Sequence, residues 1–397
     1  MYPSIGVAVP VKNGRRYVIE ALKTLRSSTN QNLRVIVSVD GDKSLVQMLR
    51  LSIPDSRFSF LQCAGSISMA EHYETLIGEL QTEWVTILGQ DDAITSAFDK
   101  EVDAAIRYAD SRGIGAVSFR RAYFNWQDGS SKRLGYVAKY AASSSPRIRS
   151  SQFAMTLAAT GVTSHFDLPQ VYTNNLIRRE VIEEVRLAFG GKLIHEPIPD
   201  TFLGVAIASH TRSYLQWPTP AFWTGTSSVS AGHREPPHKS PPNSLLVPEH
   251  IALAIAEGRE FGVGVYLWEL AQSSPLMVYS ATLVVQKLRG IKTSRLTMVI
   301  ALSASLADSL IRFTMLPQHR LPPNLASKLL RFYPGSIGRV AILLITPGFV
   351  CLQLISRVSR KIKFDRLIKR TGFKIANRDR VTVSYGDLNR RILHDPT

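Results

Sequence analysis

EWVTILGQDDAI, residues 83–94, places two adjacent carboxylates soon after a short and largely apolar run. Trp84–Leu88 has the length and composition of a strand that is buried on both faces of a parallel sheet. Asp91 and Asp92 follow this run, and a buried charge needs a partner. The stretch therefore predicts a parallel sheet with a ligand site beyond the carboxyl end of one strand.

The residues around this stretch alternate between strand and helix patterns. Apolar runs predict strands, and side chains recurring at helical spacing predict helices between them. This order favours an α/β fold with a mostly parallel sheet and helices on both faces. We expect strands at 5–9, 35–39, 58–61, 84–88 and 116–119, helices at 18–25, 45–51, 69–80, 96–112, 176–189 and 200–211, and a polar loop at 128–150.

A second pair of carboxylates, Asp40 and Asp42, follows the strand predicted at 35–39. Carboxylates at neighbouring strand ends would supply the hard oxygen ligands that Mg²⁺ or Mn²⁺ takes when it bridges to a diphosphate. Each Asp alone also has an ordinary interpretation. Asp92 would cap the helix that begins near Ser96, and Asp40 would close a turn at Gly41.

Three segments, PVKNGRRYVIEALKTL (10–25), RVIVSVDGD (34–42) and EWVTILGQDDAI, resemble the N-terminal blocks of the family 2 inverting glycosyltransferases, which have a GT-A fold. The resemblance spans about residues 4–232. It implies that Pro10 and Asn13 line a nucleoside pocket and that Asp40 bonds the base. It further implies that Asp91 binds the metal ion and Asp92 positions the donor sugar. Gly89 departs from the family pattern, which has an Asp at this position.

The same resemblance implies roles for residues outside the three blocks. In SISMAEHYETL (66–76), His72 takes the position of a donor-contacting Asn. In HEPIPDTFLGVAIA (195–208), Asp200 corresponds to the general base that removes the acceptor hydroxyl proton. Glu196 is the reserve candidate, and a helix N-cap is the ordinary interpretation of Asp200.

Two further segments are expected near the donor and the acceptor. WTGTSSVSAGH (223–233) resembles a loop that closes over the diphosphate, with His233 as a further metal ligand. SHFDLPQVYTNNLIRREVI (164–182) is expected on the acceptor side. Its candidate polar contacts are Tyr172, Asn174, Asn175, His165 and Arg178.

The two parts of the chain differ in charge. Residues 1–232 carry 24 basic and 21 acidic residues, a net +3, and residues 233–397 carry 24 and 10, a net +14. We expect a catalytic domain over 1–232, divided into a donor half (1–120) and an acceptor half (121–232). A proline-rich linker (233–248) and a basic, helical region (249–397) are expected to follow.

The basic region contains two runs without charge, 296–307 and 340–356. The second is followed by RVSRKIKFDRLIKRTGFK (357–374), whose composition is typical of a helix lying on an anionic membrane surface. We therefore expect residues 290–397 to bind the cytosolic face of a membrane, with 340–356 as a candidate for a short inserted segment. A helical bundle with a very apolar core is the alternative.

These observations predict a metal-assisted, inverting transfer of a sugar from a nucleotide-sugar, UDP-sugar first, to a glycan or lipid-linked acceptor. Cell-surface polysaccharide or glycolipid synthesis is the expected setting. Two cysteines cannot form a disulfide framework, and no secretory signal is evident, so a cytoplasmic location is expected. The alternatives are a nucleotidyltransferase, a nucleic-acid-binding protein and a non-catalytic scaffold. Nucleic-acid binding is not expected, because the cations lack interleaved aromatic residues.

Overall fold

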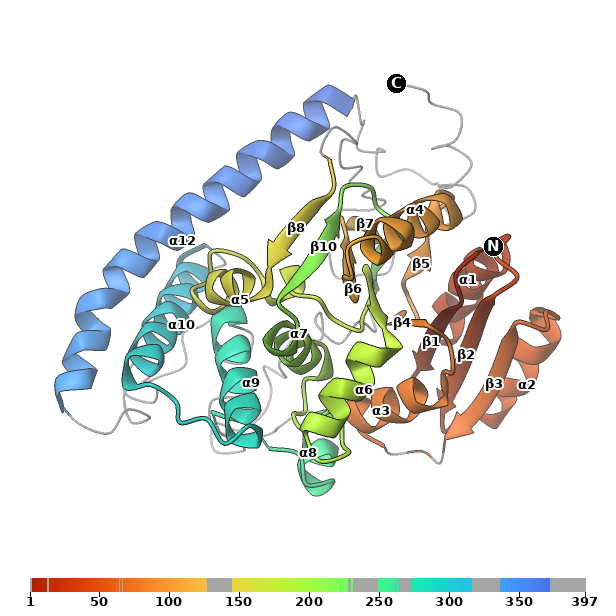
Figure 1. Ribbon diagram of the computed structural model, residues 1–397, viewed down its shortest axis with the longest axis horizontal. Coiled ribbons are helices and arrows are strands. Elements are labelled where there is room, and N and C mark those ends of the chain that lie inside the picture. The colour runs from red at the N-terminus through yellow and green to blue at the C-terminus, as the bar shows by residue number, and fades with distance from the viewer. Residues whose placement is uncertain are drawn as a thin grey trace.

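The computed structural model describes residues 2–12, 14–63, 65, 67–126, 145–227, 230, 249–260, 262–263, 273–315 and 336–371. Strands and helices alternate through the first part, and the elements described from residue 249 onward are helices (Figure 1). The strands are β1 (Ile5–Val11), β2 (Leu33–Asp40), β3 (Phe58–Cys63), β4 (Trp84–Ile87), β5 (Ala93–Ile94), β6 (Ala116–Phe119), β7 (Ala122–Asn125), β8 (Arg147–Ser150), β9 (Asn175–Arg178), β10 (Ser213–Trp217) and β11 (Phe222–Thr226). The helices are α1 (Arg15–Arg26), α2 (Lys43–Ser52), α3 (Met69–Glu79), α4 (Phe98–Asp110), α5 (Ser151–Ala159), the 3₁₀ turn η1 (His165–Asp167), α6 (Arg179–Ala188), α7 (Pro199–His210), α8 (Glu249–Ala256), α9 (Ser274–Leu288), α10 (Arg295–Met315) and α12 (Ser336–Thr371).

The central sheet has eight strands in the order β3-β2-β1-β4-β9-β6-β10-β8. Neighbours from β3 to β4 are parallel, and β10 is parallel to β6. Only β9 and β8 run against the rest. The predicted α/β architecture with a mostly parallel sheet is therefore confirmed.

Both faces of this sheet are covered by helices, because successive strand residues point to opposite sides. In β1, Val7 and Val9 belong to one core with side chains from α1, α2 and α4. Ala8, between them, belongs to the other core with side chains from α3, α6, α7 and α9. Buried on both faces, the central strands β1 and β4 are almost wholly apolar, as parallel strands usually are.

A second, smaller sheet lies beyond the carboxyl end of β4. Its order is β5-β11-β7, with β11 antiparallel to β5 and parallel to β7. Because β5 begins directly after Asp92, this sheet places residues of β11 beside the two carboxylates.

Two of the predicted elements are wrong in detail. The helix expected over 176–189 begins as strand β9 and becomes helix α6 only at Arg179. The polar loop expected over 128–150 ends in strand β8, which pairs with β10. Both strands have four residues, too few to show a period of two against the neighbouring helical pattern.

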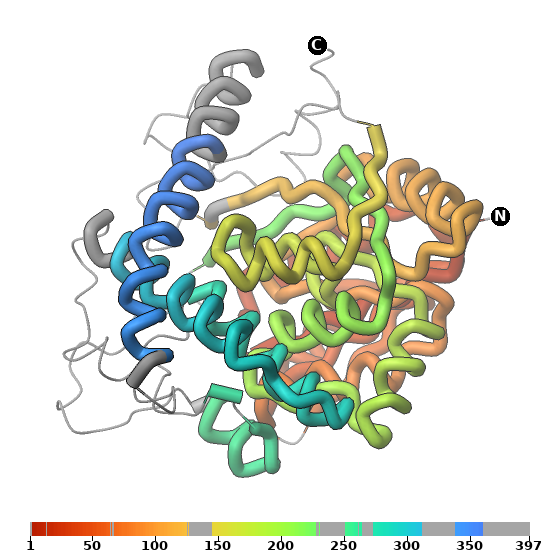
Figure 2. The backbone as a smooth tube through the Cα atoms, turned by 60° about the vertical axis from the view of Figure 1, so that its left-hand side comes forward, coloured from red at the N-terminus to blue at the C-terminus, as the bar shows by residue number. Residues whose placement is uncertain are grey.

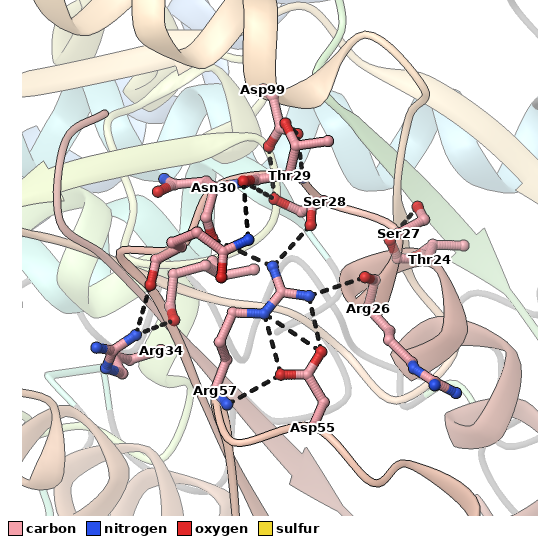
Figure 3. A network of polar contacts seen from close by, with 12 residues as sticks. Thr24, Arg26, Ser27, Ser28, Thr29, Asn30, Arg34, Asp55, Arg57 and Asp99 are labelled. Carbon is pink, nitrogen blue, oxygen red and sulfur yellow. Dashed lines mark hydrogen bonds and ion pairs between the residues drawn. The ribbon is translucent and has the colours of Figure 1, made fainter. Parts of the chain in front are cut away.

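A buried arginine joins the opposite, amino end of the sheet (Figure 3). Arg57 donates hydrogen bonds to the carbonyl oxygens of Ser28 (2.7 Å), Arg26 (2.8 Å) and Asn30 (3.1 Å), and it pairs with Asp55 at 2.8 Å. The network ties the end of α1 to the segments that precede β2 and β3. It lies far along the strands from Asp40, so we regard it as structural.

The helices after residue 249 pack on one side of this α/β unit (Figure 2). α9 packs against α7 and α5, α10 against α9, and α12 against α10. Most of the uncharged run in α10 is buried, including Val299, Leu302 and Leu306. The run in α10 is therefore part of an apolar helical core, whereas most of the apolar segment of α12 is exposed.

Candidate active site

Asp92 joins three separate segments at the carboxyl end of β4. Its Oδ1 accepts a 2.6 Å hydrogen bond from the Gly225 amide of β11, and its Oδ2 accepts a 2.9 Å bond from the Gly89 amide. The Thr173 hydroxyl also donates to Oδ2. The residue is 1% exposed, and helix α4 is preceded by Ala97. Asp92 therefore does not cap that helix.

Asp91 is held by the segment that follows β11. The hydroxyl groups of Ser227 (2.7 Å) and Ser230 both donate to its Oδ2, and the indole of Trp126 donates to its carbonyl oxygen at 3.0 Å. The WTGTSSVSAGH segment, as far as it is described, thus lies against the predicted metal ligand.

The two carboxyl groups affect one another electrostatically. The pKa of Asp92 is raised from 3.8 to about 7, first by burial and then by the neighbouring charge of Asp91. The three donated hydrogen bonds oppose this shift because they stabilise the anion. A pair of this kind is stabilised by a bound cation, which favours the ionised form of both groups.

Gly89 leaves room for the carboxyl group of Asp92 and the phenol of Tyr172. A Cβ built at position 89 would lie 2.7 Å from Asp92 Oδ2 and 2.8 Å from Tyr172 Oη. An aspartate of the usual family pattern would therefore displace both groups. In this chain the phenol of Tyr172 occupies the space beside Gly89 that an aspartate side chain would need. Tyr172 comes from the segment predicted on the acceptor side.

Asp200 lies near the same two carboxylates. Tyr73 and Tyr172 stack with ring centroids 6.1 Å apart. Burial raises the pKa of both phenols, and the charges of Asp91, Asp92 and Asp200 raise it further. The adjacent Asp91 and Asp92 and the distant Asp200 of α7 thus act on one pair of aromatic rings.

The first turn of α7 carries Asp200. The cap of α7 is Ile198, and Asp200 accepts a 2.7 Å bond from the amide of Thr201, so it serves an open helix amide without being the cap residue. Burial raises the pKa of Asp200, and the nearby cation of Arg121 opposes this. A base with a raised pKa holds an abstracted proton more strongly at neutral pH.

The ends of β1 and β2 form a polar wall beside Gln90, the residue before Asp91. Lys12 Nζ pairs with Asp40 at 3.0 Å. The side chain of Gln90 bonds the backbone of Lys12 in both directions, each at 2.9 Å, and thereby joins the loop after β1 to the loop after β4. Asp42 is the N-cap of α2, with a 3.0 Å bond from Leu45.

His72 faces the same wall from α3. Its Nε2 lies 3.7 Å from Cys63 Sγ at the end of β3. Burial lowers the pKa of His72 to about 4, although the charge of Asp40 opposes the shift. The imidazole is therefore neutral at physiological pH and acts only as a hydrogen-bonding group there.

Some predicted residues lie elsewhere. Arg178 is at the opposite end of β4, where it pairs with Asp110 and with Glu83 (3.4 Å), because the antiparallel course of β9 carries it away from the site. Glu196 accepts a bond from Ser280 of α9, and His165 lies 3.0 Å from Ser274. These two face the C-terminal helices.

Asn174 and Asn175 lie beside the site and have largely structural contacts. Asn174 has a positive φ of 74° and donates to Thr224 at 2.8 Å. Asn175 donates to the carbonyl oxygen of Tyr172 at 2.9 Å. Asn13 and His233, predicted at the nucleoside and the metal ion, are outside the described residues, as is the linker 233–248.

Several residues of the site were not predicted from the sequence. Lys12 and Gln90 lie within the segments 10–25 and 83–94, and Thr173 and Tyr73 directly follow the candidates Tyr172 and His72, so these positions were a usable signal. The contacts of Trp126, Ser227 and Ser230 with Asp91 join distant parts of the chain, which gives no local signal. Among the described residues, no group of three or more His, Cys, Asp or Glu forms a ready metal site.

Comparison with known proteins gives one short sequence match. No protein-family model matches this chain. An uncharacterized glycosyltransferase of Rickettsia typhi is 30% identical over 90 residues, which cover 23% of this chain and 28% of that relative. The chain thus matches less than a third of the length of this relative.

Several solved structures follow a similar chain path. S. aureus TarS in complex with UDP-GlcNAc is similar with a TM-score of 0.46 and 12% identity over 88% of this chain and 92% of that one. The mannosyltransferase PcManGT from Pyrobaculum calidifontis, in complex with GDP-Man and Mn²⁺, is similar with a TM-score of 0.40 and 15% identity over 87% of each chain. At these scores neither structure assigns a donor or an acceptor to this chain.

Proposed function

We propose that this chain is a GT-A glycosyltransferase of the family 2 type that moves a sugar from a nucleotide-sugar to a glycan or lipid-linked acceptor with inversion. The observation that carries the proposal is the meeting of Asp91, Asp92 and Asp200 around the Tyr73–Tyr172 pair. This meeting occurs beyond the carboxyl end of β4, where ligands bind in α/β sheets. The short match to a glycosyltransferase is consistent with it.

The donor nucleoside is assigned to the wall formed by the ends of β1 and β2. In this proposal Pro10 and Asn13 line the nucleoside, and Asp40 accepts a hydrogen bond from the base while Lys12 holds its carboxylate. His72, neutral at physiological pH, contacts the donor through its ring nitrogens. A UDP-sugar is the first donor to test.

A divalent cation, Mg²⁺ or Mn²⁺, fits the chemistry of the site. Asp91 and Asp92 offer hard oxygen ligands, and burial together with the charge of Asp91 raises the pKa of Asp92. We assign Asp91 to the metal ion, with His233 as a further ligand, and Asp92 to the donor sugar. When bound, the cation would stabilise the charge on the departing diphosphate.

Asp200 is assigned as the general base. An inverting transfer needs one group that takes the proton of the acceptor hydroxyl as that oxygen attacks the anomeric carbon. Asp200 lies near Asp91 and Asp92, whereas Glu196 is bonded to Ser280 of α9. The geometry therefore favours Asp200 over the reserve candidate.

The proposed setting is the cytosolic face of a membrane, in the synthesis of a cell-surface polysaccharide or glycolipid. Among the described residues, one helical segment, Gly338–Ser359, has the length and composition of a membrane span. The excess of cations after residue 233 would attract an anionic surface.

The test is Mn²⁺-dependent hydrolysis of a panel of nucleotide-sugars by the purified chain. We expect slow release of one nucleoside diphosphate, loss of this release in Asp91→Ala, and no loss in the control Asp103→Ala in α4, which removes only an ion pair with Arg107. If no nucleotide-sugar of the panel is hydrolysed and no nucleotide shifts the melting temperature, the proposal is contradicted and a non-catalytic scaffold is favoured.

A further inference from the structure

The outer face of α12 is predominantly apolar between residues 340 and 358. It consists of Val340, Leu343, Leu344, Ile345, Leu352, Ile355 and Val358, each 39% to 75% exposed. Only 22% of the apolar segment of this helix is buried. Soluble monomers rarely expose a contiguous apolar surface of this size, so the outer face of α12 is expected to have a partner. Figure 1 shows the helix along one side of the molecule.

The inner face of the same helix carries its polar contacts beside the buried Ile342. The side-chain amide of Gln353 donates to the carbonyl oxygens of Ala304 (2.9 Å) and Thr160 (3.0 Å). The hydroxyl of Ser356 donates to the carbonyl oxygen of Val162 at 2.6 Å, and Arg357 pairs with Asp308. The polar side chains of this segment therefore face the protein while seven large apolar side chains are exposed, unlike in a surface helix of a soluble protein, which turns its apolar side inward.

The sequence that continues this helix is strongly basic. Residues 357–370 contain seven Lys or Arg and one acidic residue. An apolar face beside a cluster of cations matches the two components of an anionic bilayer, its acyl chains and its headgroups. A second copy of the chain would bring a second cluster of like charges, which makes it the poorer occupant.

We propose that α12 lies flat in the headgroup region of an anionic bilayer, with the outer face of α12 embedded and its inner face holding the rest of the protein. The helix does not cross the membrane in this arrangement. Crossing would break the bonds of Gln353 and Ser356 to the body of the protein and would place Arg357 beside the hydrocarbon.

The docked helix is joined to the acceptor half of the catalytic unit. Gln353 and Ser356 bond residues 160 and 162, directly before η1 and the segment that leads to Tyr172. A bilayer bound to α12 would thus lie at a fixed distance from this segment. On the basis of the proposed function, this arrangement favours an acceptor anchored in the lipid over a free glycan. Membrane docking itself does not depend on the transferase activity.

The test is flotation of the full chain with vesicles of phosphatidylcholine, with or without one-third phosphatidylglycerol. We expect flotation with the anionic vesicles and at least tenfold less binding for Leu344→Glu/Ile355→Glu. The control Leu51→Glu/Leu187→Glu changes two leucines that are 84% and 76% exposed on other helices. It should float as the unchanged chain does.

A folding defect is excluded by measuring nucleotide-induced thermal shifts of both double variants, which should equal that of the unchanged chain. Alkaline carbonate should release the chain from membranes, because a helix lying on the surface is not retained as a span is. Equal flotation of the two double variants would overturn the proposal. Retention after carbonate, or a lipid-free dimer that Leu344→Glu/Ile355→Glu converts to a monomer, would also overturn it.

Discussion

Replacing Glu196 by Gln should make the stability of this protein less dependent on pH. The side chain is buried, and its Oε1 accepts bonds from the hydroxyl of Ser280 and, at 3.4 Å, from the amide of Gly262. Burial raises the pKa of Glu196 from 4.5 to about 8. The amide oxygen of Gln can accept the same two bonds without carrying a charge at any pH.

The size of the effect follows from the linkage between proton binding and folding. Between pH 4.5 and about 8 the folded chain keeps a proton on Glu196 that the unfolded chain has lost. Raising the pH therefore destabilises the fold, by about 1.4 kcal/mol for each pH unit, or about 5 kcal/mol across the window. Below pH 4.5 both states are protonated and this destabilisation is absent.

The assay is urea unfolding of Glu196→Gln and of the unchanged chain at pH 4.5, 6.5 and 8.5, followed by tryptophan fluorescence. The difference in the free energy of unfolding should grow with pH in favour of the variant. The exposed control Glu79→Gln should show a constant difference. Parallel pH curves for Glu196→Gln and the unchanged chain would refute the reasoning. Loss of donor hydrolysis with normal stability would instead identify Glu196 as part of the active site.

Three further substitutions test other parts of the structure. Gly89→Ala should cost about 1–3 kcal/mol of unfolding free energy because its Cβ would approach Asp92 and Tyr172, whereas Gly78→Ala, with no atom within 4 Å, should be neutral or stabilising in the same denaturation assay. Arg57→Ala should lower the free energy of unfolding by about 3 kcal/mol, because three backbone carbonyls and Asp55 lose their donor. Nucleotide binding measured by calorimetry should stay unchanged. A loss of unfolding free energy below about 1 kcal/mol would contradict this. Asp200→Asn should lower sugar transfer about 10²–10⁴-fold while the donor still binds, and an equal loss of donor affinity would show that Asp200 holds the donor and is not the base.

The sequence predicted the first half of the fold well because its strands are buried on both faces. Largely apolar runs such as Val35–Val39 and Trp84–Leu88 are distinct from the amphipathic helices between them. The short antiparallel strand β9 escaped prediction because four residues are too few to show a period of two beside the helical pattern of α6. The resulting reversal also explains why Arg178, expected near the acceptor, lies at the other end of the sheet.

Sequence alone determined which carboxylates follow which strands, because chain order fixes the residues at each strand end. Only the tertiary structure decided that Asp92 would bond three segments, that Tyr172 would fill the space left by Gly89, and that Asp200 would meet them from α7. These contacts join residues far apart in the chain, so no local pattern encodes them. The same holds for α10 and α12, whose runs are similarly apolar in composition. Packing buries the first and leaves the second exposed, because hydropathy records how apolar a helix is and not which side faces the protein.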